Sequence, residues 1–194
     1  MTKEEALKIV EELKNSPNMV KHALACGFAM RTLCQKLSSD PPQPSRPSKP
    51  SDPNDWEVVG LLHDADYELT DKSLERHTEE TTKKLKEIGA DQQIIDAIRG
   101  HCDKSPRETL MSKAIYAADE LTGLIVACAL VQPEKKLSSV TVDSVLRKFK
   151  DKSFAAGANR DQIKTCETEL NIPLEEFIAI TLKSMQDNSE ELGL

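Results

Sequence analysis

The sequence lacks the features of a membrane or secreted protein. No stretch approaches the roughly 18 consecutive apolar residues that a membrane-spanning helix needs, and the mean hydropathy is -0.48. The N-terminus, MTKEEALKIVEEL, is an acidic amphipathic stretch and not a signal peptide. We therefore expect a cytoplasmic protein without a membrane partner.

The sequence also lacks a cysteine framework and an overall basic charge. Its five cysteines are widely spaced and include no CxxC pair, which indicates reduced thiols. The net charge of -7 argues against binding to a nucleic-acid polymer. Residues 135–164 are an exception, because eight Lys and Arg against three Asp give +5 there and leave -12 for the remainder. This stretch is either a solvated basic face or a place that holds a small anion.

No alternating strand pattern is present, and helical periodicity runs through nearly the whole chain. With 194 residues, 38% of them hydrophobic, the chain is predicted to form a single all-α domain over 1–194. Thr2 and Glu5 form a capping box for the first helix, and Asn18 and Asp91 are candidate N-caps of later ones. After the first, the predicted helices cover 19–38, a segment from Asp55, 75–88, 91–101, 109–131, 141–150, 159–170 and 174–191.

Residues 40–55 are predicted to form a proline-rich surface loop. Its prolines recur every third residue, which matches the period of a polyproline II helix. The segment is either a plain insertion or a ligand for an aromatic-lined groove of the SH3 type. The prolines with this spacing are Pro41, Pro44, Pro47, Pro50 and Pro53.

The stretch VVGLLHDADYE, residues 58–68, is an apolar helical run that ends in an imidazole and a carboxylate, His63 and Asp64. Asp119 likewise lies within the most apolar long helix, in YAADELTG. A buried carboxylate needs a counter-charge, and a divalent cation supplies one. Imidazole and carboxylate groups projecting inward from helices are suitable ligands for such an ion. The chain has only four histidines, each on or at the end of a predicted helix: His22, His63, His77 and His101.

The order of these residues resembles the HD-domain superfamily of metal-dependent phosphohydrolases. The signature of that superfamily is a His, a later His-Asp doublet and a final Asp in an all-helical core. Members with two metals add two histidines between the doublet and the last Asp. The resemblance covers a metal-binding helical core over about 20–125, followed by a C-terminal helical extension over 135–194, in which Lys152–Arg160 is also similar to small single-domain members. The implied metal ligands are His22, His63, Asp64, His77, His101 and Asp119.

The resemblance implies a small phosphorylated substrate and an all-α HD-domain bundle. One or two divalent ions (Mn, Fe, Co, Zn or Mg) would be bound, with Asp64 able to bridge two of them. If His77 or His101 instead contacts substrate or supports another ligand, one ion remains. The reaction implied is hydrolysis of a phosphomonoester or phosphodiester, such as a nucleotide, by metal-bound hydroxide.

Further residues are candidates for catalytic and substrate-binding roles around this centre. Asp66 and Glu68 are candidate acids or bases, and Glu68 lies nearer the face of Asp64 if the helix continues. The candidate anchors for the substrate phosphate are Lys113, Lys152 and Arg160. The lysine that some relatives carry three residues after the Asp is replaced by Tyr67.

Two other functions agree with the same residues. One is a di-iron enzyme on the HD scaffold that oxidises a carbon substrate with O₂. The other is a non-catalytic module in which a metal only holds the helices together and the proline-rich loop binds a partner.

Overall fold

The computed structural model describes residues 1–39 and 52–194. Within these residues the chain is all α-helical, as predicted, with one short 3-10 helix and no strand. The predicted proline-rich loop falls mostly on 40–51, outside the described residues. The helices are α1 (Lys3–Glu12), α2 (Pro17–Ser39), α3 (Pro53–Leu62), α4 (Glu79–Glu87), α5 (Gln92–Gly100), α6 (Leu110–Leu130), η1 (Leu137–Ser139), α7 (Val142–Lys150), α8 (Arg160–Glu169), α9 (Leu174–Asp187) and α10 (Ser189–Leu192).

Side-chain caps fix several helix starts. The capping box of Thr2 and Glu5 is present, and Asp91 caps α5 by accepting a hydrogen bond from the backbone of Gln93. The prediction that Asn18 caps α2 is wrong. Ser16 occupies that place, because its hydroxyl accepts from the Met19 backbone N–H and Pro17 suits the first helical turn.

Three other boundaries differ from the prediction. Helix α3 begins at Pro53, two residues before the predicted start, since Asp52 caps it. Helix α4 begins only at Glu79, because Thr78 before it adopts a left-handed conformation with φ 67°. The C-terminal helix ends at Asp187 and is followed by the separate short helix α10.

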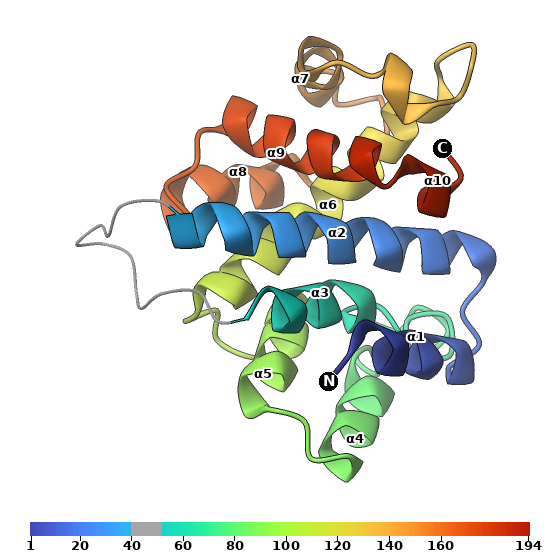
Figure 1. Ribbon diagram of the computed structural model, residues 1–194, viewed down its shortest axis with the longest axis vertical. Coiled ribbons are helices and arrows are strands. Elements are labelled where there is room, and N and C mark those ends of the chain that lie inside the picture. The colour runs from blue at the N-terminus through green and yellow to red at the C-terminus, as the bar shows by residue number, and fades with distance from the viewer. Residues whose placement is uncertain (40–51) are drawn as a thin grey trace.

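Helices α2 and α3 pack closely at a glycine. A Cβ added at Gly60 would lie 2.6 Å from the backbone of Cys26 and Gly27, so no side chain fits there. Figure 1 shows α2 crossing the molecule with α3 alongside it. This contact sets the distance between the two helices that carry the first histidine and the His-Asp doublet.

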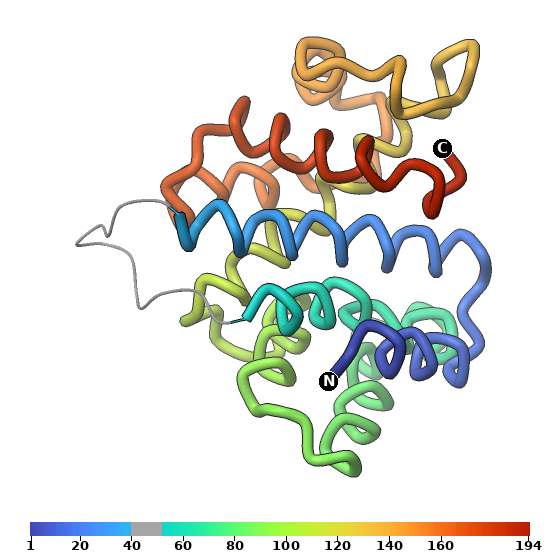
Figure 2. Tube along the Cα trace, viewed as in Figure 1, coloured from blue at the N-terminus to red at the C-terminus, as the bar shows by residue number. Residues whose placement is uncertain are grey.

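Helix α6 is the central element of the core, since most of its residues are buried. It packs against α2, α5 and α8, while α9 covers α2 on the side away from α3 (Figure 2). The C-terminal helices therefore close the core around α2 and α6. Among the helices of the described residues, none is both long and apolar enough to cross a membrane.

Candidate metal centre

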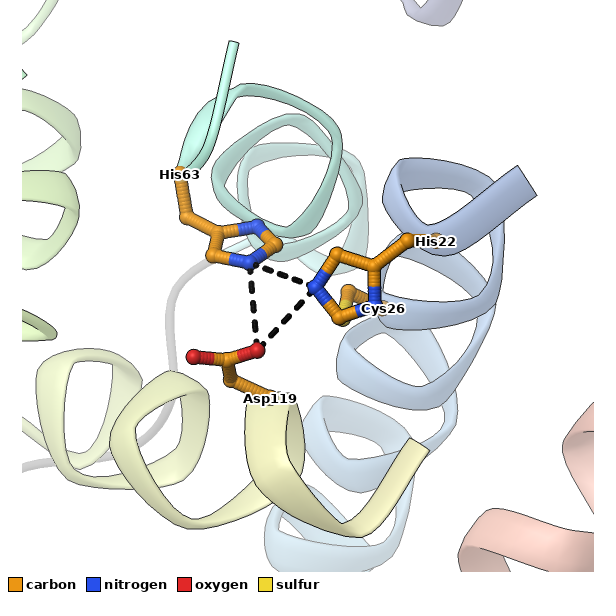
Figure 3. Close-up of side chains that lie close together, drawn as sticks. All are labelled: His22, Cys26, His63 and Asp119. Atoms are coloured by element: carbon orange, nitrogen blue, oxygen red, sulfur yellow. Dashed lines mark hydrogen bonds and ion pairs between the residues drawn. The ribbon is translucent and has the colours of Figure 1, made fainter. Parts of the chain in front are cut away.

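Six side chains from five parts of the chain meet at one place in the core. Helix α2 carries the first histidine, and the end of α3 carries the doublet. The turn before α4 and the end of α5 each supply one histidine, and the middle of α6 supplies the last aspartate (Figure 3 shows three of the six with Cys26). The structure thus brings together all the ligands implied by the sequence, namely His22, His63, Asp64, His77, His101 and Asp119.

The first half-site consists of His22, His63, Asp119 and one oxygen of Asp64. The Nε2 atoms of His22 and His63 lie 3.2 Å apart, and Asp119 Oδ1 lies 3.1 and 3.4 Å from them. Asp64 Oδ2 lies 3.7 Å from both Nε2 atoms.

The second half-site consists of His77, His101 and the other oxygen of Asp64. The Nε2 atoms of His77 and His101 lie 2.9 Å apart. Asp64 Oδ1 lies 3.1 Å from His77 Nε2 and 3.3 Å from His101 Nε2. Asp64 therefore presents one carboxylate oxygen to each half-site.

Three of the four imidazoles are oriented by a hydrogen bond at Nδ1. His63 and His101 stand at the C-terminal ends of α3 and α5, and their Nδ1 atoms donate to the carbonyls of Gly60 and Ile98. His77 Nδ1 lies 3.1 Å from Asp66 Oδ1. A carbonyl or an ionised carboxylate oxygen only accepts, so Nδ1 carries the proton in these rings and a neutral ring directs an Nε2 lone pair at the cluster.

This donor set fits divalent ions. With Nδ1 as the donor, neutral rings of His77 and His101 would direct lone pairs at each other across 2.9 Å, which requires a proton or a cation between them. Bonds of about 2.1 Å give ligand-to-ligand separations of about 3.0 Å in an octahedron and about 3.4 Å in a tetrahedron. The observed separations of 2.9–3.7 Å lie around these values.

The charged groups in the cluster shift one another's pKa. Burial alone would raise the pKa of Asp64 and Asp119, yet the neighbouring charge of His63 lowers both. Burial, the largest single influence, opposes a charge on His63 in turn, but Asp64, Cys26 and Asp119 together outweigh it and raise the pKa of His63 to about 10. Without an ion, protons therefore occupy this cluster and balance its carboxylates.

A family model described as HD domain matches residues 19–124, which is more than half of the chain. The chain belongs to the HD-domain family. Members of this family are generally metal-dependent hydrolases, which agrees with the donor set of the cluster. No curated protein and no solved structure matches the chain.

The six residues implied as ligands are called the HD cluster below. A cavity of about 400 Å³, called the metal cavity below, opens onto this cluster. Beside the ligands, its wall includes Tyr67, Cys102, Glu120 and Gln162. None of these four was predicted as a site residue. Glu120 adjoins Asp119, which was a usable signal, whereas Gln162 reaches the cavity only because α8 packs on α6, where its side chain donates to the Tyr116 carbonyl.

The two carboxylates predicted as acid or base have structural contacts instead. Asp66 is fully buried and accepts hydrogen bonds from the backbone of Thr78 and Thr81 as well as facing His77. Glu68 accepts from the backbone and hydroxyl of Ser16, at the start of α2. Asp66 thus orients a ligand and Glu68 anchors α2, and the geometry of the HD cluster gives no support to an acid-base role for either.

The three predicted phosphate anchors lie away from the cavity wall that faces the HD cluster. Arg160 donates to the carbonyls of Phe154, Ala155 and Ala158, so its guanidinium closes a loop. Lys152 is exposed. Lys113 lines a different cavity, described below. None of the three is among the described residues that line the metal cavity.

Proposed function

We propose that the chain hydrolyses a small phosphate ester at two divalent ions held by the six-residue cluster. The observation that carries this proposal is the position of Asp64, which faces both half-sites with different oxygens. A pair of ions at such a site lowers the pKa of water and neutralises charge on a phosphate.

The protein's own groups prepare the site in three ways. Hydrogen bonds at Nδ1 hold His63, His77 and His101 so that Nε2 faces the cluster. Tyr67 and Gln162 offer polar groups along the wall on which an ester can be oriented. The cavity of about 400 Å³ suits a small molecule rather than a polymer.

The test measures metal content and hydrolysis on the same samples. Protein purified without chelator is expected to hold about two equivalents of metal and to cleave nucleotide or aryl phosphates. Asp64→Asn is expected to lose both ions and activity, and His101→Ala about one equivalent. Glu11→Gln, an exposed carboxylate of α1, is the matched control and should change neither.

Two results would overturn the proposal. One is a protein that holds no metal after reconstitution. The other is a metal-loaded protein that cleaves no phosphate ester from mildly acidic to mildly alkaline pH, above all if an iron-loaded sample consumes O₂ with a carbon substrate.

A further inference from the structure

A second cavity of about 680 Å³ adjoins the metal cavity, with Asp103 in the wall of both. It lies between the segment 103–107, which joins α5 to α6, and two residues of the helices behind it, Lys113 of α6 and Glu169 of α8. A molecule held at the ions could therefore extend past Asp103 into this second cavity.

The second cavity carries an excess of positive charge in a chain of net charge -7. Its wall contains three cationic side chains and two carboxylates, namely Lys104, Arg107 and Lys113 against Asp103 and Glu169. Lys104 donates to the carbonyls of Glu75 and His77, and Arg107 is paired with Asp103. Lys113 is different, because its ammonium has no hydrogen-bond or ion-pair partner among residues 1–39 and 52–194.

Two further polar atoms in this wall are buried without a partner among the described residues. One is a donor, Arg107 Nε, and the other is an acceptor, Glu169 Oε2. A buried polar atom without a hydrogen bond costs stability, so such atoms are uncommon unless a bound ligand or water satisfies them. An anionic group would suit Lys113 and Arg107, and a donor next to it, such as an ammonium or a hydroxyl, would suit Glu169.

The walls of the second cavity are tied to the metal ligands. Arg107 donates to the Gly100 carbonyl, one residue before His101, and its guanidinium stacks 3.7 Å from the ring of Tyr116. Lys104 donates to the carbonyl of His77 itself. A ligand in this cavity would thus touch the residues that hold the backbone of both histidines of the second half-site.

We propose that the second cavity is the subsite for a remote anionic group of the substrate. This second proposal rests on the proposed function and specifies the class of substrate. The substrate class is a small molecule with a phosphate ester at one end and a carboxylate or second phosphate, beside an ammonium or hydroxyl, at the other. Binding energy from such a remote group contributes to positioning the reacting end.

The test compares two sets of phosphonates, whose carbon–phosphorus bond resists hydrolysis. One set is 2-amino-ω-phosphonoalkanoic acids of increasing chain length, and the other is the matched alkylphosphonates without the amino acid end. Isothermal titration calorimetry on the metal-loaded protein gives their affinities. At one chain length the amino acid end should raise affinity by on the order of tenfold, the size of one charge-assisted contact.

Three variants test whether this gain in affinity arises from contacts in the second cavity. Lys113→Gln should remove the gain, so that both ligand sets bind alike, and Glu169→Gln should reduce the contribution of the ammonium. Lys86→Gln, an exposed lysine of α4, should retain the gain in full.

The outcomes separate this proposal from the proposed function. The subsite is refuted if the amino acid end adds nothing at any chain length, or if the gain persists in Lys113→Gln. Alkylphosphonates that do not bind, together with amino acid ligands whose binding depends on Lys113, would support the subsite and contradict phosphate binding at the ions. Failure of both sets to bind refutes both proposals.

Discussion

Gly60 offers the sharpest test of how the fold sets the metal ligands. The Cβ of Gly60→Ala would lie 2.6 Å from backbone atoms of α2, whereas ordinary contacts begin at 3.4 Å. Helices α2 and α3 must therefore move apart by the difference between these two distances, about 0.8 Å. Backbone cannot turn away as a side chain can, so we expect the upper end of the overpacking cost, about 3 kcal/mol, offset by about 1 kcal/mol of improved helix propensity.

The net loss of about 2 kcal/mol corresponds to a fall in Tm of about 4–8 °C for a domain of this size. The distance between the Nε2 atoms of His22 and His63, now 3.2 Å, would grow with the helix separation, so the first half-site should lose its ion. Circular dichroism at rising temperature and elemental analysis measure the two effects.

Two control variants make the result specific. Gly123→Ala, where an added Cβ meets nothing within 4 Å, should be neutral or stabilising. Leu182→Ala truncates a buried side chain of α9 and should lose comparable stability while keeping both ions. The reasoning is refuted if Gly60→Ala melts at the wild-type temperature with both ions bound.

Three further predictions concern the same cluster and the thiols. Asp66→Asn should lower the metal affinity of the second half-site by about 10- to 100-fold, because it removes the charged partner of His77. Metal content should then fall from about two equivalents to about one, and unchanged content would contradict this prediction. Because Asp64, Cys26 and Asp119 together outweigh burial and raise the pKa of His63 to about 10, metal must displace protons, and metal affinity should rise as pH rises toward that value. Calorimetry in buffers of different ionisation heat should show proton release, and heats independent of buffer would count against it. Burial raises the pKa of Cys34 to about 11 and that of Cys166 to about 12, so neither should react with a disulfide reagent at neutral pH until the protein is denatured; a Cys166→Ala variant with one fewer reactive thiol in the native state would show otherwise.

Much of the fold could be predicted because local signals and packing agree. Apolar periodicity and the caps at Thr2 and Asp91 indicate helices that the structure contains. The start of α4 was missed, since the left-handed residue Thr78 is held by a backbone hydrogen bond to buried Asp66, a tertiary contact without a local pattern.

The candidate site, like the fold, could be predicted only in part. Histidines and aspartates in apolar helical stretches predict inward-facing ligands, and those residues lie together in the structure. The acid-base assignment of Glu68 assumed that the helix continues through the doublet, with about 100° per residue. Helix α3 ends at Leu62 and turns follow, so Glu68 points to Ser16 and the angular argument does not apply. Only the tertiary structure could show this.

The charge of the cluster connects the number of ions to the substrate. Its two facing carboxylates, Asp64 and Asp119, contribute -2. A single divalent ion would neutralise them and leave little attraction for a phosphate, whereas two ions would leave +2, which matches the dianion of a phosphate monoester. The apolar run VVGLLHDADYE could then end in a largely buried carboxylate, because the ions proposed to compensate Asp64 would also supply the positive charge that a phosphate requires. By this reasoning, loss of the second half-site should weaken binding of dianionic phosphates more than binding of monoanionic diesters.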